Sequence, residues 1–271
     1  MITHRKMVAV YAVAFLYELE NLLRKRAGYM ISAAYLLLVA AVCKSQSFRE
    51  SYFSWAMQIP VSLIALVLPT VMMVIIVVSL SSVFSSETER AAAEIPACCL
   101  MGSQGRNTTK LLAGIALSVI MSTALFAATV SITSITGNLK LNAVVEGIDY
   151  YGIVYWELRP VWTVRGHLLL AAIGQDTGAA MAAIITLVIS KRSKTPAAAM
   201  AVTVTVLLAE FFFRHYGPFP VILSEINLWS LFEDFMLFDM DLFHGTPVEN
   251  LAMISGVWIV ICCMLSLTII K

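Results

Sequence analysis

Residues 84–110 read FSSETERAAAEIPACCLMGSQGRNTTK, a short charged insert between two long uncharged stretches. Residues 51–86, which lead into the charges, and residues 111–139, which follow them, contain no Asp, Glu, Lys or Arg. A helix needs about 20 apolar residues to cross the roughly 30 Å hydrocarbon core of a bilayer. Both stretches are long enough, so the sequence predicts that 85–110 is a surface loop between two membrane spans.

The composition of the chain agrees with this interpretation. Of its 271 residues, 60% are hydrophobic and 13% are charged, whereas soluble domains carry about 25% charged residues. The net charge of +1 argues against nucleic acid as a partner. We therefore expect an all-α polytopic membrane protein in which residues 1–271 form a single transmembrane domain.

Uncharged runs predict six transmembrane helices. Pro60 and Pro69 fall inside the second span and are expected to kink it. An even number of spans puts both termini on the same side of the membrane. The expected spans cover about 27–43, 57–84, 111–135, 167–190, 195–213 and 251–270.

Lysine and arginine are divided unequally between the two sides. Twelve of the 18 lie in the N-terminal segment, the 84–110 insert, the 191–194 connection and the C-terminus, and the other six lie in the opposite set of connections. Cytoplasmic loops carry the excess of these residues in membrane proteins. The sequence thus predicts that both termini and the 85–110 loop are cytoplasmic. We further expect the membrane to be the plasma membrane of a bacterium.

The segment 7–26, before the first span, predicts a helix lying in the cytoplasmic interface, here called the elbow helix. Its apolar residues recur at helical spacing, and its second half carries charges on the other side. The alternative is that these residues extend the first span inward. The apolar stripe consists of Val8, Tyr11, Ala12, Phe15, Leu19, Leu22 and Leu23.

Two segments on the expected outer side, 141–165 and 215–249, are rich in aromatic residues but too broken to cross a bilayer. Such segments predict re-entrant or interfacial helices at the outer mouth. Trp229 belongs to a set of outer tryptophans expected in an interfacial belt. The acidic surplus of 215–249 favours either the exit of a cationic solute or simply an outer surface without positive charge.

The 85–110 loop has the pattern of a short surface helix. Its Ala-rich run has high helix propensity, Pro96 stops or restarts the helix, and residues 102–105 are expected to form a turn. Arg106 and Lys110 then lie on one helix face at the foot of the third span. The residues expected to contact a soluble partner are Glu87, Glu89, Arg90, Glu94, Ile95, Pro96, Leu100 and Arg106.

Two carboxylates interrupt otherwise apolar spans. Asp176 lies in the fourth span beside Gln175, and Glu210 lies in the fifth, four residues before Arg214. Because a carboxylate within the bilayer is costly, such a residue is a candidate for function. Glu210 is expected to pair with Arg214 near the outer interface. Asp176 with Gln175 either forms a polar contact between spans, or lines a solute path or a subunit interface.

The loop resembles the cytoplasmic loop of the permease subunits of type-2 ATP-binding cassette exporters. In that family the second span runs into a Phe-Ser-x-Glu-like segment, a proline follows, and an Arg and a Lys open the third span. A Gly-Thr pair of the family is replaced here by three alanines at 91–93. The matching residues are Phe84, Ser85, Glu87, Pro96, Arg106 and Lys110.

The resemblance implies a permease that moves a small amphiphile, drug or peptide out of the cytoplasm. It also implies two partners: a second permease subunit, identical or different, and separate P-loop ATPase subunits docked on the 85–110 loop. ATP and Mg²⁺ would be bound by those ATPases. The chain itself has no GxxxxGK[ST], HExxH or GxSxG motif, so we expect no enzymatic activity and no resident cofactor or metal.

One other interpretation remains open. The chain is alternatively a secondary transporter in which Asp176 or Glu210 carries a proton or Na⁺, and the loop is then a solvated connector without a partner. The two interpretations differ in the residues that transport requires. An exporter requires the loop, whereas an ion-coupled transporter requires the carboxylates.

Overall fold

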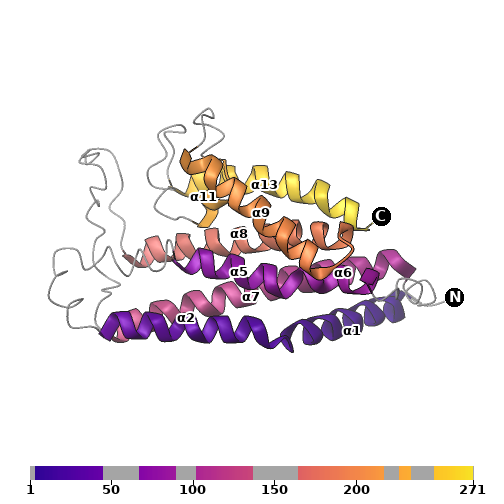
Figure 1. Cartoon of the computed structure of the whole chain (residues 1–271), viewed down its shortest axis with the longest axis horizontal. Helices are drawn as coiled ribbons and strands as arrows, with labels where there is room; N and C mark the ends of the chain where they lie inside the picture. The colour runs from indigo at the N-terminus through magenta and orange to yellow at the C-terminus, as the bar shows by residue number, and fades with distance from the viewer. Residues whose placement is uncertain are drawn as a thin grey trace.

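The computed structural model describes residues 4–44, 67–89, 102–136, 164–216, 226–232 and 247–270, and all regular structure within them is helical (Figure 1). The helices are α1 (His4–Leu23), α2 (Arg26–Lys44), α5 (Leu68–Leu80), α6 (Ser82–Glu89), α7 (Gly102–Ile135), α8 (Val164–Arg192), α9 (Pro196–Tyr216), α11 (Trp229–Phe232) and α13 (Pro247–Ile270).

Five of these helical segments are long and apolar enough to cross a membrane. They are α2, the joined α5 and α6 over Leu68–Ser86, α7, α8 and α13. The remaining predicted span, 195–213, coincides with α9, whose apolar part Pro196–Phe212 is shorter. The described residues thus fit a multi-pass helical membrane protein, as the sequence predicts.

The long helices run back and forth along one axis (Figure 1). The start of α1 and the end of α13 lie at the same end of the bundle, which is also where α6 ends and α7 begins. We call this end the α6 end. The opposite end holds the C-terminus of α2 and the N-terminus of α8.

Helix α8 is the centre of the bundle, because it packs against α5, α6, α7, α9, α11 and α13. Burial follows this arrangement: 72% of the apolar window in α5 and α6 is buried, but only 22% of that in α13. The exposed side chains of helix α13 are mainly apolar, and they include Val260 and Met264. A helix that is hydrophobic all round and still exposed is suited to lipid contact.

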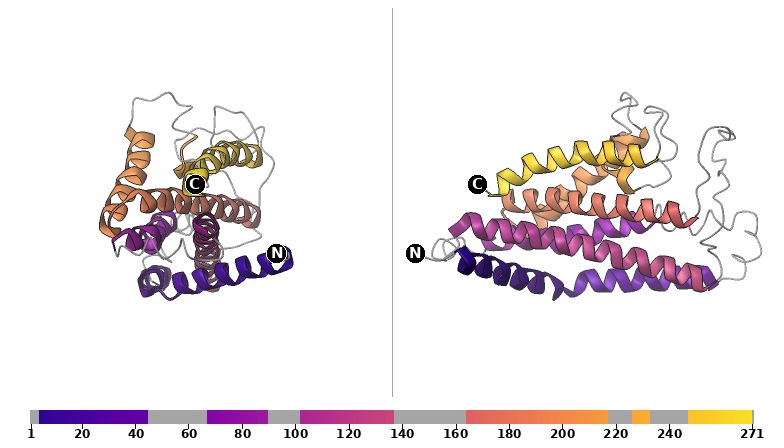
Figure 2. Two further views of the ribbon diagram at one scale, coloured as in Figure 1. Left: turned by 90° about the vertical axis from the view of Figure 1, so that its right-hand side faces the viewer. Right: turned by 180° about the vertical axis from the view of Figure 1, so that it is seen from behind.

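Helix α1 begins three residues before the predicted elbow helix and ends at Leu23. It packs mainly on α7, and Phe15, Leu19 and Leu22 of the predicted stripe contribute to the core. The first half of the stripe does not, since Val8 is 56% exposed. Seen along the bundle, α1 runs across the view while α2 is seen nearly end-on, so the two do not form one straight rod (Figure 2).

Candidate functional site

Three of the eight residues predicted to contact a partner lie in helices at the α6 end of the bundle. Glu87 and Glu89 belong to the last turn of α6, and Arg106 belongs to the first turns of α7. The other five, Arg90, Glu94, Ile95, Pro96 and Leu100, lie outside the described residues.

The predicted turn at 102–105 is only partly correct. Gly102 has a φ of +62°, a conformation that glycine adopts without steric cost. Residues 103–105, however, already belong to α7, which begins nine residues before the predicted third span. The helix extends because its first turns are anchored: Gly105 and Thr109 are buried against the bundle.

Within the described residues, the helix of the second span is interrupted at a position without a proline. Pro69 lies in the first turn of α5, where no helical hydrogen bond is lost, and Pro60 lies outside the described residues. The break falls at Ser81, between α5 and α6. No glycine or proline marks it, so the cause must come from elsewhere in the fold.

That cause is Ser190 of α8, whose hydroxyl enters the helical hydrogen-bond ladder. Its Oγ donates to the carbonyl oxygen of Ser81 at 2.7 Å and accepts from the backbone N–H groups of Phe84 at 3.1 Å and Ser85 at 3.3 Å. The hydroxyl of Ser85 also donates to the Ser81 carbonyl, at 2.6 Å. A side chain inserted into the ladder is a known origin of helix kinks. We call this region the α5–α6 joint.

Lys25, in the connection between α1 and α2, binds the joint from a second side. Its Nζ donates to the carbonyl oxygen of Ser79 at 2.6 Å and to Ser82 Oγ at 2.7 Å. Burial, together with the nearby charge of Lys110 and against the opposing charge of Glu18, lowers the pKa of Lys25 to about 8. The amine therefore loses its proton at a lower pH than an exposed lysine does.

Lys110 of α7 binds the joint from a third side. This residue is only 3% exposed, and its Nζ donates to the carbonyl oxygen of Val83 at 3.2 Å. The same ammonium group lies 5.1 Å from the centroid of the Phe84 ring, within the range of a cation–π contact. Phe84 and Lys110, two of the residues that carry the family resemblance, are therefore in contact.

The α6 end is also linked to α13. Asn107 Nδ2 of α7 donates to the carbonyl oxygen of Ile269 at 3.0 Å, and Lys191 Nζ of α8 donates to the carbonyls of Thr268 and Ile269. The last carbonyls of a helix have no partner within the helix, and a cation near them is favourable. The end of α13 is thus fastened to α7 and α8.

Asp176 forms a polar contact between two spans. Thr123 Oγ1 of α7 lies 2.9 Å from Asp176 Oδ2 of α8. Asp176 is half-buried, whereas its neighbour Gln175 is only 1% exposed. Of the two roles considered for Asp176, the contact between spans is present in the structure.

The backbone of Glu210 is contacted by a segment far from it in the sequence. Asn227 Nδ2 donates to the backbone carbonyl of Glu210 at 2.8 Å. The expected partner, Arg214, has a side chain outside the described residues. The sequence carries no local signal for this contact, because residues 210 and 227 belong to different elements.

Residues 226–232, which contain α11, form a buried plug among α8, α9 and α13, and we call them the α11 plug. Trp229 Nε1 donates to the Leu207 carbonyl at 3.1 Å, and Trp258 Nε1 donates to the Ile226 carbonyl at 2.9 Å. Trp229 is 6% exposed, so its placement in a lipid-facing belt was wrong. Its indole N–H pairs within the protein instead.

The plug fits against two glycines of α8. A methyl group added at Gly174 would lie 2.6 Å from the carbonyl oxygen of Leu231, and one at Gly178 would lie 2.7 Å from Cε2 of Phe232. Small residues allow such close approach between helices in membranes. Here they admit the plug rather than another span.

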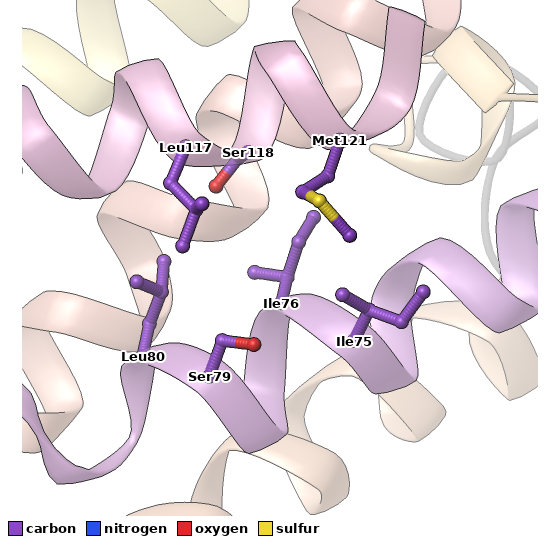
Figure 3. Close-up of a pocket in the computed structure, with 7 residues that line it drawn as sticks. All are labelled: Ile75, Ile76, Ser79, Leu80, Leu117, Ser118 and Met121. Carbon is purple, nitrogen blue, oxygen red and sulfur yellow. The ribbon is translucent and has the colours of Figure 1, made fainter. Parts of the chain in front are cut away.

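A small space remains between α5 and α7 (Figure 3). It is lined by Ile75, Ile76, Ser79, Leu80, Leu117, Ser118 and Met121, and it leaves about 10 Å³ for the centre of a water molecule. That is about the least that one water needs, so the space is too small for an organic solute. Among the described residues, no group of three or more His, Cys, Asp and Glu is placed to hold a metal ion.

No protein-family model matches the chain, and no curated protein resembles it closely enough to be a relative.

Proposed function

We propose that the chain is the membrane-spanning permease subunit of an ATP-binding cassette exporter. It would move a small amphiphile, drug or peptide across the cytoplasmic membrane of a bacterium, driven by separate ATPase subunits. The observation that carries this proposal is the α5–α6 joint: α6 carries Glu87 and Glu89 of the loop, and side chains from α7, α8 and the α1–α2 connection hold its break.

The joint gives a partner a mechanical route into the bundle. The partner ATPases would bind ATP and Mg²⁺, close, and push on the loop of residues 85–110. Because α6 continues α5, the displacement would reach the second span directly, and Ser190, Lys25 and Lys110 would pass it to the neighbouring helices. The spans would then tilt and open the outer side.

The remaining parts of the proposal follow the same scheme. Helix α1 would lie in the cytoplasmic interface, and a second permease subunit would complete the transport path. In the loop, Glu94 and Arg90 would steer the ATPase to its position, while Ile95 and Leu100 would fill an apolar groove on it. The chain would contribute no catalytic group to ATP hydrolysis.

A secondary transporter is the alternative, and the contact between Thr123 and Asp176 favours it. A carboxylate within a span is commonly part of an ion or proton pathway. In that reading Asp176 or Glu210 would carry the coupling ion, and the 85–110 loop would need no partner.

The proposal predicts that the chain, isolated from its native membrane in a mild detergent, co-purifies with a soluble P-loop ATPase. The chain alone is expected to bind and hydrolyse no ATP, because it has no P-loop. The measurement is quantitative mass spectrometry of the purified complex together with an ATPase assay of each component. An isolate without any ATPase at near-stoichiometric amount would contradict the exporter assignment.

The proposal also fixes which end of the bundle faces the cytoplasm. In a variant whose native cysteines have been replaced, a cysteine at Ser103 should be protected from a membrane-impermeant thiol reagent in intact cells, and a cysteine at Asn142 should react. Ser103 is exposed at the start of α7, so its protection would come from the membrane and not from burial. The opposite labelling pattern would reverse the orientation and remove the loop from the reach of a cytoplasmic ATPase.

A further inference from the structure

Asp176 lies deep within the membrane-spanning part of the bundle. Twelve residues of α8 precede it and sixteen follow it, so it stands about 18 Å from one end of the helix and about 24 Å from the other. Its side chain is half-buried, and that of Thr123, its neighbour on α7, is exposed. This polar pair therefore reaches the surface of the bundle at a depth where lipid would otherwise cover the protein.

The surface around the polar pair differs from the other exposed surfaces of the spans. Helix α13 presents large apolar side chains such as Val260, which suit contact with lipid. Beside the pair, α7 instead exposes Ala124 and Ala127, whose small side chains leave room for another group. Because a carboxylate that faces hydrocarbon is costly, we expect this surface to hold something other than lipid.

The chain itself does little to balance the charge of Asp176. Among the described residues its one hydrogen-bonding partner is Thr123, whose single hydroxyl hydrogen is also within reach of the Val119 carbonyl oxygen at 2.9 Å. The one ion pair found in the described parts of the chain joins Arg24 to Glu20. The six expected spans contain no Lys or Arg, so the spans of a second copy could not supply a positive charge at this depth either.

The surroundings of the pair indicate which kind of cation fits. A hard metal ion such as Mg²⁺ or Ca²⁺ takes about six or more oxygen ligands, whereas the pair offers one carboxylate and one hydroxyl. Ile120 and Ile173 are 48% and 49% exposed, and each lies three residues from a member of the pair, on the same helix face. Since α7 and α8 run in opposite directions (Figure 1), these side chains lie on opposite sides of the pair.

We infer that the face of α7 and α8 around Asp176 and Thr123 binds an amphiphilic organic cation. Its positive group would lie on the carboxylate, and its apolar part would lie along Ile120 and Ile173. The site narrows the transported solute of the proposed function to a cation. That the bound cation is also transported rests on that function, whereas the binding site does not.

The test measures equilibrium binding of radiolabelled tetraphenylphosphonium, an apolar organic monocation, to the full-length chain in nanodiscs of zwitterionic lipid. No partner is present, and the binding to empty nanodiscs is subtracted. We expect saturable binding that unlabelled tetraphenylphosphonium displaces. Triphenylphosphine oxide, which has similar aryl groups but no net charge, should not displace it.

Variants of the chain then locate the site. Asp176→Asn keeps the size of the side chain and removes its charge, so it should weaken binding by about tenfold or more, which corresponds to about 1.4 kcal/mol. Asp176→Glu keeps the charge and should bind more tightly than Asp176→Asn. Ala124→Phe adds bulk at an exposed position and should block the site without altering the carboxylate. Glu210→Gln, which removes the other carboxylate of the expected spans, is the matched control and should bind as the wild type does.

Absence of saturable binding, or equal binding by the wild type and Asp176→Asn, would overturn the inference, and so would an equal weakening in Glu210→Gln. Retention of radioactive Na⁺ by the wild type but not by Asp176→Asn, without binding of the organic cation, would overturn it in favour of ion coupling.

A second measurement follows the uptake of tetraphenylphosphonium by inside-out vesicles that contain the chain and its co-purified ATPase. ATP-dependent uptake that Asp176→Asn loses supports the cation as the transported solute. No uptake by a formed complex refutes that step but leaves the binding site intact. Failure to form any complex refutes the proposed function alone.

Discussion

Gly174→Ala is expected to destabilise the folded protein by about 1–3 kcal/mol, the usual cost of forcing an extra group into a packed interior. The added methyl group would lie 2.6 Å from the carbonyl oxygen of Leu231, a backbone atom that cannot rotate away. The α11 plug would have to move as a unit, which would strain its hydrogen bonds to α9 and α13. The readout is the midpoint of thermal unfolding in detergent, followed by tryptophan fluorescence.

Two other glycines supply the controls for this prediction. At Gly178 the nearest atoms belong to the ring of Phe232, and a side chain can adjust, so we expect a smaller loss for Gly178→Ala. At Gly256 in α13 nothing lies within 4 Å of an added methyl group, so Gly256→Ala should leave stability unchanged or raise it slightly. Equal unfolding midpoints for the Gly174 and Gly256 variants would show that α8 does not hold the plug tightly.

Reversing the charges of Glu89 and Glu94 to lysine is expected to weaken association with the partner ATPase by about tenfold or more and to abolish transport. Both residues belong to the loop that would dock on the ATPase, where they would face positive charge on the ATPase surface. Lysines at these positions would then place like charges against each other, which costs several kcal/mol at an interface. A loss of about 1.4 kcal/mol is already a tenfold loss of affinity. The measurement is the amount of ATPase that co-purifies with the variant. Membrane insertion of the variant should be normal.

Asp176→Asn separates the two proposed functions. In an exporter this change leaves ATPase association intact, because Asp176 contacts Thr123 in the spans and lies away from the α6 end. In an ion-coupled transporter the ranking reverses: Asp176→Asn is fatal and the loop changes are mild. Normal transport by the double lysine variant would therefore exclude the coupling role of the loop.

The sequence predicts the helices of this fold well and their interruptions poorly. Uncharged runs locate α2, α7, α8 and α13, because the requirement for apolar length is local. The break at Ser81 is not local, since its cause, Ser190, lies more than a hundred residues further along the chain. Pro69 lies in the first turn of α5, where proline is tolerated, so it does not account for the interruption at Ser81.

In the candidate site, too, local features were predictable from the sequence and contacts between helices were not. The spacing of Arg106 and Lys110 is a property of one helix and was predictable, whereas the contact of Lys110 with Val83 and Phe84 depends on how α7 packs against the joint. Glu210 shows the same limit: nothing local in the sequence indicates that Asn227 donates to its backbone carbonyl.

The fastening of the end of α13 bears on how the protein is built during synthesis. Helix α13 is apolar on nearly every side and mostly exposed, so it can enter the membrane without waiting for neighbours. Lys191 and Asn107, which bind its last carbonyls, are synthesised earlier and belong to helices already in place. Docking of α13 is then a separate, late assembly step, in which the end of the newly inserted helix must contact these two side chains.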